Sequence, residues 1–289
     1  MSNEEAECVD ERFDGWPLRD LMSSPRLLAI SGPVFPNPMW SVHLPDGSMK
    51  NKKITLLALA FLALLVQVVL PGATCEAGME SEKSPYPAVA PLNQYLIPDR
   101  NSEIALARSA APSSISDGAE VLVLGRAGYA TAAEGKNGFV CLVERSFGAA
   151  TDFPEFWNPK IMAPICANAP AARTYLPAVV MKSKLVMAGR SRTEIAQAIR
   201  SALNRNELPA LEPGAMCYMM SKQQYLSDDA KCWHPHMMWF IPGDAAKSWG
   251  ANLPGSPAIA ANDPEDRMTI FLVWVGNWSD GTPAPRDMH

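Results

Sequence analysis

Residues 119–144, AEVLVLGRAGYATAAEGKNGFVCLVE, contain the clearest strand pattern in the chain. Residues 119–124 and 129–134 have the composition of strands. Gly135-Lys136-Asn137-Gly138 follows them and is a hairpin signal, because Asn-Gly readily adopts positive φ. Residues 139–144 are apolar at five consecutive positions, so both faces of this segment should be covered. We therefore predict a hairpin that returns through 139–144 inside the domain.

A pair of helices is predicted next. Residues 173–188 show helical spacing, with Pro177 near the first turn and Gly189 as a natural stop. Residues 191–194, SRTE, form a capping box. After the box, one apolar face is formed by Ile195, Ala198, Ile199, Ala202 and Leu203. The basic residues of this region, Lys182 among them, are interpreted as the solvated side of the two helices.

Strands are predicted again in the last third of the chain. They are expected at 215–220, 233–241 and 268–275, the last of them central, and 252–264 is interpreted as a loop. A loop is also expected at 146–170, and a short helix at 103–110 with Ser102 as its cap. Because strands and helices do not alternate, we predict an α+β fold. It consists of an antiparallel sheet of about five or six strands with the helical hairpin packed on one face.

Residues 49–77, MKNKKITLLALAFLALLVQVVLPGATCEA, have the layout of a secretory signal peptide. Three lysines precede seventeen residues without charge, and Pro71-Gly72 and small residues follow. A signal peptide should begin near the N-terminus, so residues 1–48 are interpreted as a mis-called extension of the reading frame. The alternative is that the extension is real and the apolar run is an uncleaved signal anchor. Both alternatives place the rest of the chain outside the cytoplasm.

The remaining chain is divided by composition. Residues 78–101 contain several prolines, and we expect a linker or an extended arm there. Residues 102–278 are expected to form a single domain, and residues 279–289 a flexible tail. Cys75 also permits a lipoprotein form with an acyl anchor, although the preceding residues depart from the usual Leu-led motif. The predicted location is the periplasm or the extracellular space.

Charge limits the possible partners. The chain has 25 basic and 30 acidic residues, and beyond residue 77 there are 19 and 21, a net charge of −2. Such a surface has no basic stripe for nucleic acid and no electrostatic attraction to an anionic membrane. Membrane contact is therefore expected only through the signal or a lipid anchor, and the partner is expected to be a small molecule or an envelope protein.

Four cysteines follow the signal, at positions 141, 166, 217 and 232. In an oxidising compartment an even number suggests disulfides, and the local pairs Cys141–Cys166 and Cys217–Cys232 are expected. The alternative is that the cysteines are buried small hydrophobic residues.

One cluster suggests metal chemistry. Within WHPHMM, His234 and His236 lie two residues apart, so on a strand both imidazoles would point to the same face. Nearby thioethers would favour copper, and two imidazoles with a carboxylate would suit zinc or iron. The alternative is a hydrogen-bonded structural pair. A transition metal is the one cofactor that the sequence suggests.

Motifs for other chemistry are weak. We find no nucleophile elbow, phosphate loop or zinc-protease helix, and the sequence does not decide whether the protein is an enzyme. A thiol hydrolase using Cys217 or Cys232 beside His234 is a further alternative. Paired carboxylates such as Asp228-Asp229 and those at 263, 265 and 266 are interpreted as solvated turns, with calcium binding as the alternative. Aromatic side chains could instead line a binding surface, for which the candidates are Trp157, Tyr218, Trp233 and Trp239.

Three segments resemble a family of uncharacterised exported bacterial proteins. They are NGFVCLVER at 137–145, Pro164-Ile165-Cys166, and YMMS at 218–221 with WHPHMMWF at 233–240. The resemblance covers roughly residues 102–245 and implies bacterial export and a single domain. The family has no assigned activity, so no catalytic residue can be carried over to this chain. Our first hypothesis is a non-enzymatic binding domain of the cell envelope. The alternative is a metal-binding protein or metalloenzyme centred on His234 and His236.

Overall fold

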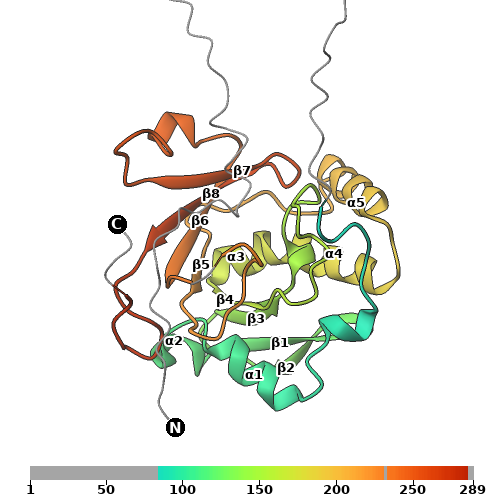
Figure 1. The fold of residues 1–289 in the computed structure, drawn as a ribbon, viewed down its shortest axis with the longest axis horizontal. Coiled ribbons are helices and arrows are strands. Elements are labelled where there is room, and N and C mark those ends of the chain that lie inside the picture. Colours follow the sequence, from blue (N-terminus) through green and yellow to red (C-terminus); the bar gives the residue numbers. More distant parts are fainter. Residues whose placement is uncertain (1–83, 231–232, 286–289) are drawn as a thin grey trace, which may run out of the picture. The chain divides into compact units, whose positions relative to one another are not determined.

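The computed structural model describes residues 84–230 and 233–285 (Figure 1). The predicted extension at 1–48 and signal peptide at 49–77 lie outside these residues. None of the helices in the described part of the chain is long and apolar enough to cross a membrane.

In the described residues the domain is built on a mixed sheet of eight strands in the order β2-β1-β3-β4-β5-β6-β8-β7. Neighbouring strands are antiparallel except β1 and β3, which are parallel. The α+β class is confirmed, but the sheet has more strands than predicted and is not wholly antiparallel. The strands are β1 (Glu120–Gly125), β2 (Gly128–Ala133), β3 (Val140–Glu144), β4 (Ala163–Ala167), β5 (Met216–Met219), β6 (His236–Pro242), β7 (Ile259–Asp263) and β8 (Met268–Trp274).

The first hairpin turns between Gly125 and Gly128, which lie opposite each other at the ends of β1 and β2. The predicted hairpin at Gly135–Gly138 is therefore wrong. After β2 the chain returns beside β1, and β3 pairs with β1 on the side away from β2. The physical reason is burial: β3 is apolar on both faces, and at this place in the sheet the helices on the two sides cover both of them.

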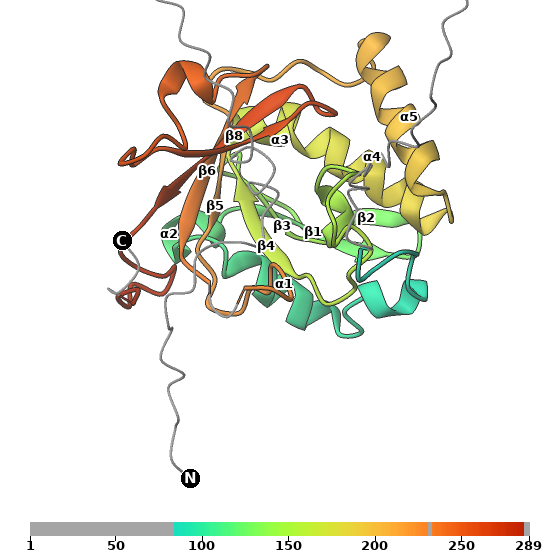
Figure 2. The same cartoon turned by 45° about the horizontal axis from the view of Figure 1, so that its top comes forward.

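Helices cover both faces of the sheet. α3 (Ala169–Thr174), α4 (Leu176–Met187) and α5 (Arg192–Asn204) share one buried cluster with β3 to β6 and β8, whereas α1 (Arg100–Arg108) packs on the opposite face of β1, β3 and β4. Figures 1 and 2 show α1 and α4 on either side of these strands. The predicted helical pair is present on one face, but the second face also has a helical cover, which includes the short α2 (Ser113–Ser116).

The N-cap of each helix depends on residues next to the helix, so the sequence predicts some of these caps. Ser191 and Glu194 form the predicted capping box of α5. α1 begins earlier than predicted, because Asp99 and not Ser102 is its N-cap. The Asp99 carboxylate accepts a hydrogen bond from the Ser102 backbone N–H at 2.8 Å.

Two strands lie in segments that were predicted to be loops. β4 lies within 146–170, and β7 within 252–264. Because β7 pairs with β8, β8 is second from the edge of the sheet and not central as predicted. The segment before β7, which contains η4 (Lys247–Trp249), packs alanine side chains against Phe271 on the same sheet face as α1. Trp239 of β6 packs against the same cluster.

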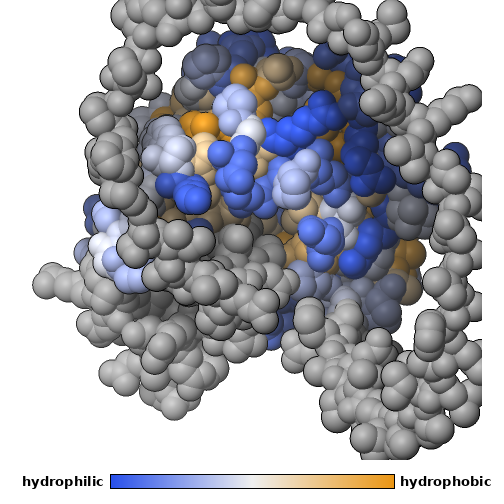
Figure 3. Space-filling model, turned by 90° about the horizontal axis from the view of Figure 1, so that it is seen from above, coloured by the Kyte–Doolittle hydropathy of each residue, from blue (hydrophilic) through white to orange (hydrophobic). Residues whose placement is uncertain are grey.

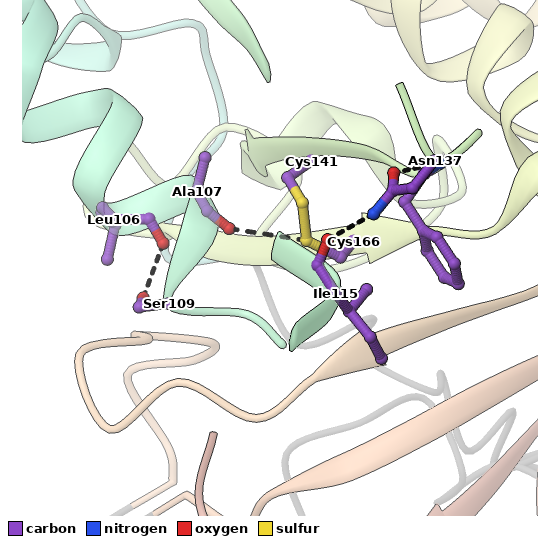
Figure 4. Close-up of a disulfide and its surroundings, with 8 residues drawn as sticks. Leu106, Ala107, Ser109, Ile115, Asn137, Cys141 and Cys166 are labelled. Atoms are coloured by element: carbon purple, nitrogen blue, oxygen red, sulfur yellow. Dashed lines mark hydrogen bonds between the residues drawn. A yellow bond between two sulfur atoms is a disulfide. The ribbon is translucent and has the colours of Figure 1, made fainter. Parts of the chain in front are cut away.

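A disulfide joins Cys141 on β3 to Cys166 on β4, as expected (Figure 4). The two residues are directly opposite in the antiparallel pair, with Cα atoms 4.0 Å apart. Both are buried beneath α1, and the Cys166 sulfur lies 3.9 Å from the Ala107 carbonyl oxygen. Cys217 is a buried free cysteine on the other face of the sheet, and Cys232, its expected partner, lies outside the described residues.

The segment before α1 is packed onto the domain. Tyr95, at the end of η2 (Leu92–Tyr95), is fully buried, and its hydroxyl donates to the Trp157 carbonyl at 2.9 Å. Arg145 Nε donates to the Tyr95 carbonyl at 2.7 Å, and Arg145 Nη2 contacts Glu103 Oε1 on α1 at 2.9 Å. This buried ion pair ties the arm and α1 to the end of β3.

The face seen in Figure 3 carries mostly hydrophilic residues, with smaller hydrophobic patches between them.

Candidate functional site

His236 is the first residue of β6 and lies in a row of three directly opposed residues. Met219 on β5 pairs with it on one side and Trp274 on β8 on the other. Along β6, residues 236, 238 and 240 are buried and residues 237 and 239 are half-buried, so His236 belongs to the face that carries the main core. Met219 belongs to the same core.

The two predicted metal ligands lie against one aromatic ring. The ring centroids of His234 and His236 are 5.4 and 5.3 Å from that of Trp274, both edge-to-face. His236 Nδ1 is 2.8 Å from the His234 carbonyl oxygen, which also accepts from Gln224 Nε2 at 3.2 Å. Burial lowers the pKa of His236 to about 4, so its imidazole is neutral near pH 7.

A zinc or iron site would need a carboxylate beside these two imidazoles. Among the residues that the structure describes, no group of three or more His, Cys, Asp or Glu side chains could hold a metal ion.

The four aromatic candidates do not form one surface. Trp157 is buried in the main core against Phe156. Tyr218 lies on the disulfide face beside Phe139, and Trp239 lies on the same sheet face near Phe271. Trp233 contacts Tyr225. A common binding surface of the candidate residues is therefore not assembled, although a role for each residue stays a prediction.

A pocket of about 230 Å³ lies elsewhere, and we call it the Tyr175 pocket. It opens between the junction of α3 and α4, the connection from α5 to β5, and the turn between β7 and β8. Most of its wall is apolar, and Thr174, Asn206, Asp266 and Arg267 supply polar groups. The lining residues are Thr174, Tyr175, Ala178, Leu203, Asn206, Leu208, Pro209, Ala210, Leu211, Pro242, Asp266, Arg267 and Met268.

Behind the pocket wall lies a buried lysine. Lys182 on α4 is fully buried, and its Nζ donates to Asp266 Oδ2 at 2.7 Å and to the Ala149 carbonyl at 3.1 Å. Burial alone would lower the pKa of Lys182, but the charges of Asp266, Asp263 and Glu265 outweigh it and raise the pKa. The ammonium group is therefore held charged inside the domain.

Glu144, the last residue of β3, is also buried near this lysine. The Tyr175 hydroxyl, on a pocket residue, donates to its carboxylate at 3.1 Å. Burial raises the pKa of Glu144 to about 7, against the opposing effects of Tyr175 and Lys182. Gly148, in η3 (Ser146–Gly148), makes the arrangement possible, because a Cβ atom there would overlap the Glu144 carboxylate.

Asp263 completes the acidic group at the end of β7. Its Oδ1 accepts from the Asp266 backbone N–H at 3.0 Å. Burial, with the nearby charge of Asp266, raises the pKa of Asp263 to about 6, although Lys182 opposes the shift. Strongly perturbed carboxyl groups beside a pocket are typical of functional sites.

The sequence pattern does not predict this buried group of carboxylates around Lys182. The prediction of solvated carboxylates at 263–266 is wrong for Asp263 and Asp266, and the prediction that Lys182 is solvated is wrong too, because these side chains are buried. One signal existed: α4 reads LPAVVMKSKLVM, which is apolar on almost every side, so a lysine within it had few exposed positions to occupy.

Raised carboxyl pKa values predict a particular dependence of stability on pH. Glu144 holds its proton more tightly in the folded chain than at its ordinary pKa of 4.5. Its contribution to stability is therefore complete below pH 4.5 and is lost as the pH rises through about 7. Between pH 5 and 8, the wild type should lose about 2–3 kcal/mol more of its unfolding free energy than Glu144→Gln.

Urea unfolding followed by tryptophan fluorescence measures this difference. Glu134→Gln, at an exposed position, is the matched control and should follow the wild-type profile. Parallel profiles for Glu144→Gln and the wild type would show that Glu144 titrates normally.

Comparison with known proteins adds no relative. No family model, curated protein or solved structure matches the chain.

Proposed function

We propose that this chain is an exported, non-enzymatic binding domain of the bacterial cell envelope that holds a small amphipathic molecule in the Tyr175 pocket. The observation that carries the proposal is the pocket's composition. Apolar side chains such as Leu203, Leu208 and Met268 would cover an apolar body, and Thr174 and Arg267 would fix a polar group. Its volume of about 230 Å³ is below the roughly 300–1,000 Å³ of typical ligand pockets, which favours a small ligand.

The lining favours binding over catalysis. None of the described residues that line the pocket is a serine, cysteine or histidine, so the wall supplies no Ser–His or Cys–His pair. A concave site of this size also suits a small molecule better than a protein partner, whose interface would bury about 800 Å² on each side.

Two observations support export. Residues 49–77 have the order of charge, apolar run and small residues that a signal peptide requires. The Cys141–Cys166 disulfide fits an oxidising compartment, because such bonds are rare where thiols are kept reduced.

Filling the pocket tests the proposal. Ala210 is an exposed lining residue, so Ala210→Trp should occupy the pocket without disturbing the core. Native mass spectrometry of chain purified from its own host should show an adduct of constant mass on the wild type and none on Ala210→Trp. The matched control is Ala88→Trp, at an exposed position outside the pocket lining, which should keep the adduct. An adduct-free wild type, or an adduct that survives Ala210→Trp, would refute binding in this pocket.

A further inference from the structure

The start of β6 carries a buried nitrogen atom that the fold leaves without a partner. His236 is 2% exposed, and its Nε2 has no hydrogen-bond partner among the described residues. More than 90% of buried polar groups in folded proteins are hydrogen-bonded, so such an atom points to a bound group.

The hydrogen bond at the other ring nitrogen fixes the state of this imidazole. A carbonyl oxygen can only accept, so His236 Nδ1 carries the proton that is donated to His234 at 2.8 Å. In the neutral ring, Nε2 therefore carries the lone pair. Metal-binding histidines have this arrangement, with one ring N–H donated to a backbone carbonyl and the other nitrogen turned to the metal.

The residues that flank His236 in the sheet carry a thioether and an aromatic ring. Met219 lies directly opposite His236 on β5, and directly opposed residues have Cβ atoms about 4.5–5.5 Å apart. A thioether with imidazole nitrogens is a ligand set that favours Cu(I). Trp274, in contact with both imidazoles, adds an aromatic ring of the kind that attracts a cation.

We propose that His236 Nε2, the Met219 thioether and the His234 imidazole bind one Cu(I) ion beside Trp274. Gln224 supports the site by donating to the same His234 carbonyl that holds His236. The site is independent of the Tyr175 pocket, since no residue is shared between them. In the described part of the chain no carboxylate joins the two imidazoles in a group of three, which fits a soft monovalent ion better than a hard divalent one.

Copper titration of the purified full chain tests the site. Free thiols compete for Cu(I), so every protein carries Cys217→Ala and is alkylated at its accessible cysteines. Under anaerobic conditions with a chromophoric Cu(I) chelator as competitor, one Cu(I) should bind per chain. X-ray absorption at the copper edge should show nitrogen and one sulfur ligand. Tryptophan emission should be quenched on binding, and Trp274→Phe should remove much of the quenching.

Two methionines on one strand provide a matched pair of variants. Met219→Leu should weaken Cu(I) binding about tenfold or more and remove the sulfur signal. Met216→Leu makes the same change on β5, three residues away and on the opposite face of the strand. This variant should leave the Cu(I) affinity and the sulfur signal unchanged. His236→Gln should abolish binding, with urea unfolding to confirm that it is folded. Absence of stoichiometric Cu(I), or equal binding by the two leucine variants, would overturn the proposal.

Discussion

Replacement of Arg145 by methionine should lower the free energy of unfolding by about 3–5 kcal/mol. Arg145 and Glu103 are both buried, and the side chains are 0% and 2% exposed. Methionine removes the positive charge and its hydrogen bonds but keeps an unbranched side chain in the same space. Among the described residues, the Glu103 carboxylate would then keep the hydrogen bond from the Leu124 backbone N–H at 3.0 Å and lose the one from Arg145. An uncompensated buried charge is the costly element of this variant.

Urea unfolding of two further variants separates the effect of charge from that of packing. Arg145→Met combined with Glu103→Gln removes both charges and should recover about 1–2 kcal/mol of the loss. Arg173→Met breaks an exposed ion pair with Glu212 and should leave stability nearly unchanged. A loss for Arg145→Met no larger than that for Arg173→Met would show that the buried pair is not important for stability.

Replacement of Lys182 by methionine should also cost about 3–5 kcal/mol, and the cost should grow with pH. The side chains of Lys182 and Asp266 are 0% and 7% exposed. Without the ammonium group, Asp266 would lie near Asp263 and Glu144 with no cation among them. At pH 5 these last two carboxyl groups are largely protonated, because their pKa values are raised to about 6 and 7. At pH 8 they are ionised, so the repulsion that Lys182 relieves is larger.

Unfolding free energies of the wild type and Lys182→Met at pH 5 and pH 8 measure this effect. Lys222→Met, which removes one partner of an exposed pair with Asp280, is the control and should show little cost at either pH. A cost for Lys182→Met that is independent of pH would mean that lost packing, and not charge, explains the effect.

The sequence predicted the parts of the fold that depend on local pattern. The Ser191–Glu194 capping box, the Pro177 helix start and the disulfide between Cys141 and Cys166 each follow from residues close in sequence. The position of β3 was not predictable in this way. Both Gly125–Gly128 and Gly135–Gly138 permit a turn, and only burial of β3 between β1 and β4 decides which one forms the hairpin.

The candidate site was predictable only in part. The nearness of His234 to His236 follows from their spacing, but Met219 and Trp274 reach them through strand register, which depends on the whole sheet. The contact of Lys182 with Asp266 joins residues 84 positions apart. Nothing in either local sequence specifies that contact, because it results from packing of α4 against the turn before β8.

A crystal structure of the chain recovered from its natural compartment tests the small-molecule proposal most directly. We predict electron density for a compact organic molecule in the Tyr175 pocket, with its apolar part against Leu208 and its polar group near Thr174 or Arg267. A pocket that holds only water in protein recovered in this way would contradict the proposed function.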